Sequence, residues 1–161
     1  MKLDEKKKAK EKAILNHVYS DTNYEIIPSE RPDFTLKAKN KDEVFGVEIT
    51  ELYLSENHAK AMNLKSQNAE MISPSYERYK QKLLEVIADK NQKSMQYSKD
   101  VAYLELVIDD CEKQFINADK DFFTLLKENE EMHQVIAASN FKRVFVLSKY
   151  KNAPIVIALE A

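Results

Sequence analysis

The sequence predicts an α/β domain in which a central mixed β-sheet is flanked by helices on both sides. Segments with the two-residue alternation of strands are interleaved along the chain with segments that have the helical period. Val101–Ile108 is almost continuously apolar, which is typical of a strand covered on both faces. With 161 residues and no repeat, linker or low-complexity segment, we expect residues 1–161 to form a single domain.

The composition is that of a folded globular protein, with 43% hydrophobic and 32% charged residues. The net charge of −2 provides no general attraction to nucleic acid, so such binding needs a local basic patch. Cys111 is the only cysteine, which excludes an internal disulfide and suits a reducing compartment. Because there is also no long apolar run or signal peptide, we expect a cytoplasmic protein without membrane association.

Two common kinds of active site are excluded by the residue types. The three histidines, His17, His58 and His133, do not have the spacing of zinc ligands with one another or with Cys111. Gly46 is the only glycine, so the chain cannot form a glycine-rich phosphate loop.

The first element is an amphipathic helix over residues 3–19, with an apolar stripe of Ile14, Leu15 and Val18. The lysine run Lys6–Lys8 is expected mostly on its solvated face. Glu11 precedes the stripe residues by three, four and seven positions, so it lies in line with the buried side. It is either a solvated glutamate at the end of the stripe or an acid that points toward a functional site.

A short strand is predicted at Tyr24–Pro28, followed by the proline-bounded segment Pro28–Pro32. That segment is expected to be rigid, because residues that precede proline favour extended conformations. Arg31–Leu36 and Val44–Glu51 then alternate apolar and polar residues, and the link between them is short and polar. This pattern predicts a β-hairpin.

If the hairpin folds symmetrically about Asn40 and Lys41, Asp33 lies opposite Glu48. Directly opposed residues of an antiparallel pair have Cβ atoms about 5 Å apart. Two carboxylates this close repel each other unless one is protonated or a cation lies between them. Mg²⁺ or Mn²⁺, which take oxygen ligands, suit such a pair. The apolar residues fall on the other face: Phe34, Leu36, Phe45, Val47 and Ile49.

Gly46 lies inside the second hairpin strand, two residues before Glu48 and on the same face. Such a glycine marks either a bulge or close packing contact, or a place where a ligand comes near the backbone. Because it neighbours the two acids, we expect Gly46 to allow the approach of a substrate.

Two helices are predicted after the hairpin, from Ser55 to about Met71 and from Tyr76 to about Lys93. Lys90 continues the apolar stripe of the second helix, which consists of Tyr76, Tyr79, Leu83, Leu84 and Ile87. Its side chain either extends into solvent at the helix end or lies on apolar surface and reaches a neighbouring site. Lys37, on the Asp33 face of the hairpin, is the weaker candidate for such a role.

The rest of the chain continues the alternation of strands and helices. Glu105 interrupts the strand Val101–Ile108 and needs a partner if it is buried: an arginine or lysine of a neighbouring helix, or local exposure of the strand. Asp109-Asp110 is expected to be the turn that ends this strand. Helices are then predicted over Asp119–Glu128 and Glu131–Ala138, and strands over Arg143–Ser148 and Pro154–Leu159.

Pro32-Asp33 followed by Glu48-Ile49-Thr50 resembles the motif of the PD-(D/E)XK nuclease superfamily. The order of predicted elements is similar to the restriction-endonuclease-like core, and the likeness covers nearly the full length. The resemblance implies that Asp33, Glu48 and the carbonyl of Ile49 bind the metal, and that Glu11 points toward it. The chain departs from the motif at Thr50, which stands where the family has lysine, so Lys90 or Lys37 would have to supply that charge.

The resemblance implies a Mg²⁺- or Mn²⁺-dependent nuclease acting on nucleic acid, with DNA favoured. In this reading Thr50 hydrogen-bonds the attacking water, and Lys90 or Lys37 stabilises the transition state. The alternative is a catalytically inactive module with the nuclease fold that serves in binding or assembly. Thr50 at the lysine position and the slightly negative net charge of the chain favour this alternative. A third interpretation treats Asp33 and Glu48 as polar residues of an exposed hairpin. With so modest a basic surface, we expect the domain to work as a homodimer or beside a partner.

Overall fold

The computed structural model describes residues 3–52, 76–97, 100–110, 120–150 and 153–160. Along the chain these residues form α1 (Leu3–Leu15), β1 (Tyr24–Pro28), β2 (Phe34–Ala38), β3 (Val44–Leu52), α3 (Tyr76–Ser94), β4 (Leu104–Asp110), α4 (Lys120–Glu128), α5 (Glu130–Ala138), β5 (Phe141–Tyr150) and β6 (Ala153–Glu160). These elements agree with the predicted order of strands and helices. The helix predicted between Ser55 and Met71 lies outside the described residues.

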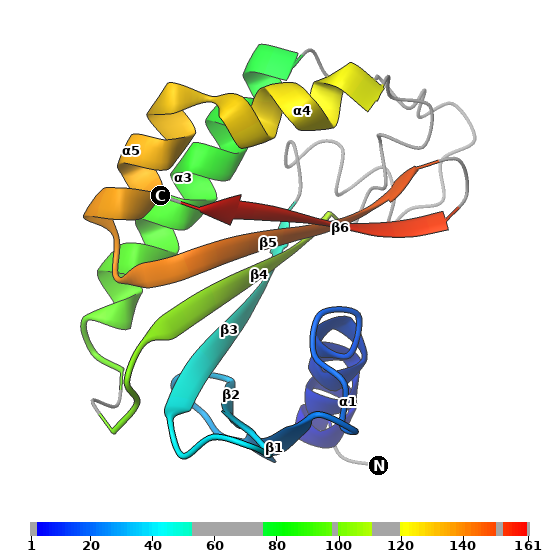
Figure 1. Cartoon of the computed structure of the whole chain (residues 1–161), viewed down its shortest axis with the longest axis vertical. Coiled ribbons are helices and arrows are strands. Elements are labelled where there is room, and N and C mark those ends of the chain that lie inside the picture. The colour runs from blue at the N-terminus through cyan, green and yellow to red at the C-terminus, as the bar shows by residue number, and fades with distance from the viewer. Residues whose placement is uncertain (1–2, 53–75, 98–99, 111–119, 151–152, 161) are drawn as a thin grey trace.

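The strands form one six-stranded mixed sheet in the order β1-β2-β3-β4-β5-β6. β1, β2 and β3 pair antiparallel, as do β5 and β6, whereas β4 is parallel to both of its neighbours. Figure 1 shows α1 on one face of the sheet and α3, α4 and α5 on the other. The predicted fold class, a mixed sheet flanked by helices, is confirmed. No helix of the described residues is long and apolar enough to cross a membrane.

Alternate residues of the central strands supply two hydrophobic cores, one on each face of the sheet. Phe45, Val47 and Ile49 of β3 pack beneath α1, together with Ile14 and Leu15. The other face of the sheet packs against α3 and α5, and the predicted α3 stripe residues Tyr79, Leu83, Leu84 and Ile87 are all buried there. Every residue of β4 is buried, as expected for a strand covered on both faces.

The β2–β3 hairpin has the register that its symmetry about Asn40 and Lys41 predicts. Phe34 pairs with Val47, and Leu36 pairs with Phe45. Continuing this register by one residue places Asp33 opposite Glu48. Because β2 begins only at Phe34, β3 extends past its end from Glu48 to Leu52.

The predicted N-terminal helix is shorter than expected and ends at Leu15. The amide of Asn16 donates a hydrogen bond to the backbone carbonyl of Tyr19, and such local bonds compete with continuation of a helix. The turn that follows brings Tyr19 into the core, where its ring meets that of Tyr24 edge-on at 4.9 Å.

The prediction that Asp109-Asp110 forms a turn is wrong, because both are the last residues of β4 and both are buried. They pair in parallel with Glu51 and Leu52 of β3. Asp110 accepts a hydrogen bond of 2.9 Å from the hydroxyl of Ser148 on β5. A buried carboxylate is tolerated in a strand when it is hydrogen-bonded in this way.

Glu105 is fully buried, and its partners come from a neighbouring strand and a turn, not from a helix as predicted. Arg143 of β5 forms an ion pair with it at 3.0 Å, and the hydroxyl of Tyr19 donates a hydrogen bond of 2.5 Å. The side-chain partners of Glu105 thus come from β5 and from the turn after α1. Its role is to join the α1 turn to the sheet.

Candidate active site

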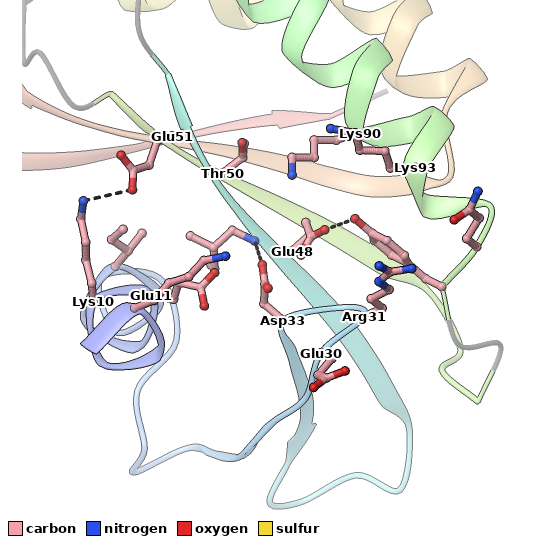
Figure 2. A pocket seen from close by; sticks show the side chains of 15 residues that line it. Lys10, Glu11, Glu30, Arg31, Asp33, Glu48, Thr50, Glu51, Lys90 and Lys93 are labelled. Atoms are coloured by element: carbon pink, nitrogen blue, oxygen red, sulfur yellow. Dashed lines mark hydrogen bonds and ion pairs between the residues drawn. The ribbon is translucent and has the colours of Figure 1, made fainter. Parts of the chain in front are cut away.

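A cavity of about 540 Å³ lies between α1 and α3, where β3 extends past the end of β2; we call it the α1–α3 cavity. Figure 2 shows acidic side chains at its centre and lysine and arginine side chains around them. The structure brings six of the residues singled out from the sequence to this cavity: Glu11, Asp33, Glu48, Ile49, Thr50 and Lys90. They come from α1, from the loop before β2, from β3 and from α3.

Asp33 is fixed at the open edge of β3. Its Oδ2 accepts a hydrogen bond of 2.8 Å from the backbone N–H of Ile49. In a strand the N–H and C=O of one residue face the same neighbour, so the Ile49 carbonyl faces this edge as well. The Asp33 carboxylate and the Ile49 carbonyl therefore lie close together at the edge of β3, just past the end of β2.

Glu48 is only 5% exposed and lies beside Asp33. Burial, a hydrogen bond to Asp33 and the negative charge of Asp33 together raise the pKa of Glu48 to about 9, while the charge of Lys90 acts in the opposite direction. The hydroxyl of Tyr97 donates a hydrogen bond to Glu48 Oε2 (Figure 2). At neutral pH Glu48 therefore carries a proton, which relieves the repulsion between two adjacent carboxylates.

Glu11 is buried and points toward the acid pair from α1, so it is not a solvated glutamate at the end of its stripe. Its burial and the negative charge of Asp33 raise its pKa, and the neighbouring Lys8 lowers it. The Lys8 Nζ lies 3.2 Å from Glu11 Oε1 and 3.8 Å from Asp33 Oδ1. Lys8 is thus not a purely solvated member of the lysine run; it is half-buried between two of the acids.

Basic side chains surround the acids on two walls of the cavity. Lys90 and Lys93 of α3 lie along one wall with Arg31, and Lys10 of α1 lies along the other (Figure 2). Lys7, also on α1, lines the cavity as well. Lys10 forms an ion pair with Glu51 at 3.0 Å. A local concentration of positive charge of this kind can attract an anionic ligand to a protein whose net charge is slightly negative.

Two residues considered from the sequence do not contribute to the cavity. A Cβ atom at Gly46 would lie 2.5 Å from Cγ of Pro32 and 2.8 Å from Cδ2 of Leu104. The close approach at this glycine is therefore internal packing, and the expectation that substrate approaches there is wrong. Lys37 also points elsewhere: its Nζ donates to the carbonyl of Lys41 at 2.9 Å, in the hairpin loop.

Sequence reasoning missed Lys8 and Tyr97. Lys8 belongs to a charged run whose period gives no sign that one member reaches a loop 21 residues further along the chain. Tyr97 follows the end of α3, where no apolar period extends. One signal in the sequence could have indicated Tyr97. The predicted helix ends shortly after Lys90, so a residue of the turn that follows can lie near the same site as the Lys90 side chain.

The oxygen atoms at the centre of the cavity fit a divalent cation of the Mg²⁺ type. Mg²⁺ is commonly held by one or two carboxylates and keeps several waters or substrate phosphate oxygens as further ligands. Asp33 and Glu48 supply two carboxylates, and Ile49 supplies a carbonyl. Among the residues that the structure describes, no group of three or more His, Cys, Asp or Glu side chains is arranged to hold a metal ion. Further ligands would therefore come from backbone, water and substrate.

Comparison of the chain with protein families, with curated proteins and with solved structures gives no match. The likeness to the PD-(D/E)XK superfamily therefore remains an expectation from the sequence motif. Any functional conclusion rests on the geometry of the α1–α3 cavity.

Proposed function

We propose that this protein is a Mg²⁺- or Mn²⁺-dependent phosphodiesterase that cleaves nucleic acid, with DNA as the favoured substrate. The observation that carries the proposal is the pairing of Asp33 with Glu48 inside a cavity that has lysines and an arginine on its walls. Two carboxylates that share a proton in a buried place exchange that proton readily for a divalent cation.

In the proposed site Asp33, Glu48 and the Ile49 carbonyl hold the cation. When bound, such a cation polarises a phosphodiester and lowers the pKa of a bound water. Thr50 is half-buried on the same strand and can hydrogen-bond the attacking water. Lys90 lies near enough to Glu48 to lower its pKa, and in this place its charge stabilises the negative charge that develops on the phosphate.

The basic walls supply the contacts to the substrate backbone. Phosphate contacts by Lys and Arg position a nucleic acid without reading its sequence. Arg31 and Lys93 on one wall and Lys7 on the other suit this role, since all three line the cavity outside the acid pair. We place this activity in the cytoplasm, where Mg²⁺ and nucleic acid are both present, and propose a homodimer as the working form.

The test is cleavage of labelled single- and double-stranded DNA and RNA in the presence of Mg²⁺ or Mn²⁺. Asp33→Asn and Glu48→Gln should abolish cleavage, whereas Asp42→Asn and Glu43→Gln should retain it. The control residues are of the same types and are exposed near the loop of the same hairpin. Cleavage by Asp33→Asn at the wild-type rate would rule out the assignment. Size-exclusion chromatography with light scattering separates a monomer from a homodimer.

A second candidate function is a catalytically inactive module with the same fold that binds or assembles with a partner. Thr50 favours it, because the position that carries lysine in the superfamily has no ammonium group here. Calorimetry with Mn²⁺ separates the two functions. The enzyme should bind Mn²⁺ in a way that Glu48→Gln abolishes, and the inactive module should show no such binding.

A further inference from the structure

The ammonium group of Lys8 lies in a complete set of contacts at the edge of the α1–α3 cavity. It donates to the backbone carbonyls of Ser29 at 3.0 Å and Asp33 at 3.1 Å, and it forms an ion pair with Glu11 at 3.2 Å. It also lies 3.8 Å from Asp33 Oδ1 and 4.8 Å from the centre of the Phe34 ring. Three hydrogen-bond donors on the ammonium thus have three oxygen partners.

We propose that Lys8 is a fixed cation of the site, and that it limits the site to one divalent ion, held between Asp33 and Glu48. This inference rests on the proposed function, because it concerns the metal of that site. Phosphodiester-cleaving sites with two ions hold them about 3.5–4 Å apart, so that one carboxylate touches both. Asp33 is the carboxylate that lies between Glu48 and Glu11, and its Oδ1 side already faces the Lys8 ammonium.

The positions of the contacts show why a second ion would compete with Lys8. An ion on the Glu11 side of Asp33 would take oxygen ligands at about 2.0–2.1 Å from the same carboxylates that the ammonium contacts. The ion and the ammonium would then compete for the same carboxylate oxygens while repelling each other. When Glu11, Asp33 and Glu48 are all ionised, these three acids and Lys8 together carry a net charge of −2, which one divalent ion balances.

The contacts also make Lys8 a positioning residue. It joins α1 to both ends of the Ser29–Asp33 segment, and the backbone N–H of Ser29 donates to the Asp33 carbonyl at 2.9 Å. The hydroxyl of Ser29 donates to the Pro32 carbonyl at 2.5 Å, which closes the same segment. The Lys8 side chain therefore fixes the position of Glu11 relative to Asp33.

The test is the number of Mn²⁺ ions per chain, measured by calorimetry on protein first treated with a chelator. The wild type should bind one ion. Lys8→Met keeps the apolar length and removes the charge, and it should bind a second ion close enough to the first to broaden the Mn²⁺ electron paramagnetic resonance signal by spin coupling. Lys12→Met, on the same helix and paired with Asp21, should bind one ion as the wild type does.

Two further variants keep the result decisive. Lys8→Arg retains the charge and should bind one ion, and the double variant Lys8→Met with Glu11→Gln should return from two ions to one. If Lys8→Met is unfolded by circular dichroism, Lys8→Gln, which can still donate to the carbonyls, takes its place. Two ions on the wild type, or one ion on both Lys8→Met and Lys8→Gln, would overturn the role of Lys8 and leave the proposed function standing. No Mn²⁺ on the wild type would overturn both.

Discussion

The carboxylate of Asp33 accepts a hydrogen bond from the backbone N–H of Ile49, 2.8 Å away, at the point where β3 continues beyond β2. This contact gives Asp33 a structural task that is separable from its proposed chemistry. One oxygen satisfies an edge N–H of the sheet, and the carboxylate as a whole faces the α1–α3 cavity. Substitutions that keep an acceptor oxygen but remove the charge should therefore separate folding from function.

Asp33→Ala should lower the free energy of unfolding by roughly 1–2 kcal/mol, because the Ile49 N–H loses its acceptor in a partly buried place. Asp33→Asn keeps an acceptor oxygen, so its stability should remain near that of the wild type. Both variants should lose cleavage. Urea denaturation and the nuclease assay measure the two effects, and equal destabilisation of the two variants would contradict this account.

Glu48 should make the stability of the protein depend on pH. Its pKa is about 9 in the folded protein, compared with an ordinary value of 4.5. Between these values folded Glu48 keeps a proton that the unfolded chain has released, so stability falls as pH rises from about 4.5 to about 9. Since one pKa unit corresponds to about 1.4 kcal/mol, Glu48→Gln should gain stability over the wild type by up to about 1.4 kcal/mol for each pH unit between pH 5 and pH 9.

Urea denaturation of wild type, Glu48→Gln and the exposed control Glu43→Gln at pH 5, 7 and 9 tests this dependence. The wild-type and Glu43→Gln curves should fall together as pH rises, and the Glu48→Gln curve should fall less. Parallel curves for all three proteins would show that Glu48 titrates normally in the folded state.

Metal binding should release the proton that Glu48 carries at neutral pH. A carboxylate must be deprotonated to act as a ligand, so Mn²⁺ binding at pH 7 should release about one proton from Glu48 and become tighter as pH rises toward 9. Calorimetry in buffers with different ionisation enthalpies counts the released proton. Binding without proton release at pH 7 would place the ion away from Glu48.

The centre of the site could be predicted from the sequence because it follows from local patterns. Strand alternation and a short polar link determine the hairpin register, which places Asp33 opposite Glu48. The helical stripe of α3 likewise leads to Lys90, which lines the cavity. Both predictions use only the period of a single element or of two elements joined by a turn.

The parts of the site that were missed depend on how separate elements pack. The Lys8 contacts to Ser29 and Asp33 require the position of α1 over the loop before β2, which no periodicity encodes. Asp109-Asp110 looked like a turn because adjacent acids are rare in buried strands, yet Ser148, 38 residues beyond Asp110, supplies a hydrogen bond to it. Gly46 was misread for the same reason, since Leu104 of another strand fills the space beside it.

Gly46→Ala should destabilise the fold and disturb the site together. The added methyl group would meet the Pro32 ring at 2.5 Å and Leu104 at 2.8 Å, so one of them has to move. Overpacking of this kind typically costs about 1–3 kcal/mol. Because Pro32 precedes Asp33, Mn²⁺ binding should weaken as well. Val44→Ala, at an exposed position of the same strand, is the control, and unchanged thermal stability of Gly46→Ala would show that the contact is not tight.

Tyr97→Phe should lower the affinity for Mn²⁺ only through its effect on the protonation of Glu48. The Tyr97 hydroxyl donates to Glu48 Oε2, and a donor to a carboxylate stabilises its charged form, so its loss should raise the Glu48 pKa further. Mn²⁺ should then bind several-fold more weakly at pH 7, and the deficit should shrink at pH 9.5, where a larger share of Glu48 is ionised in both proteins. Tyr103→Phe, a half-buried tyrosine whose ring stacks on Phe45 outside the α1–α3 cavity, is the matched control. A deficit that is equal at both pH values would mean that Tyr97 acts by packing and not through the proton of Glu48.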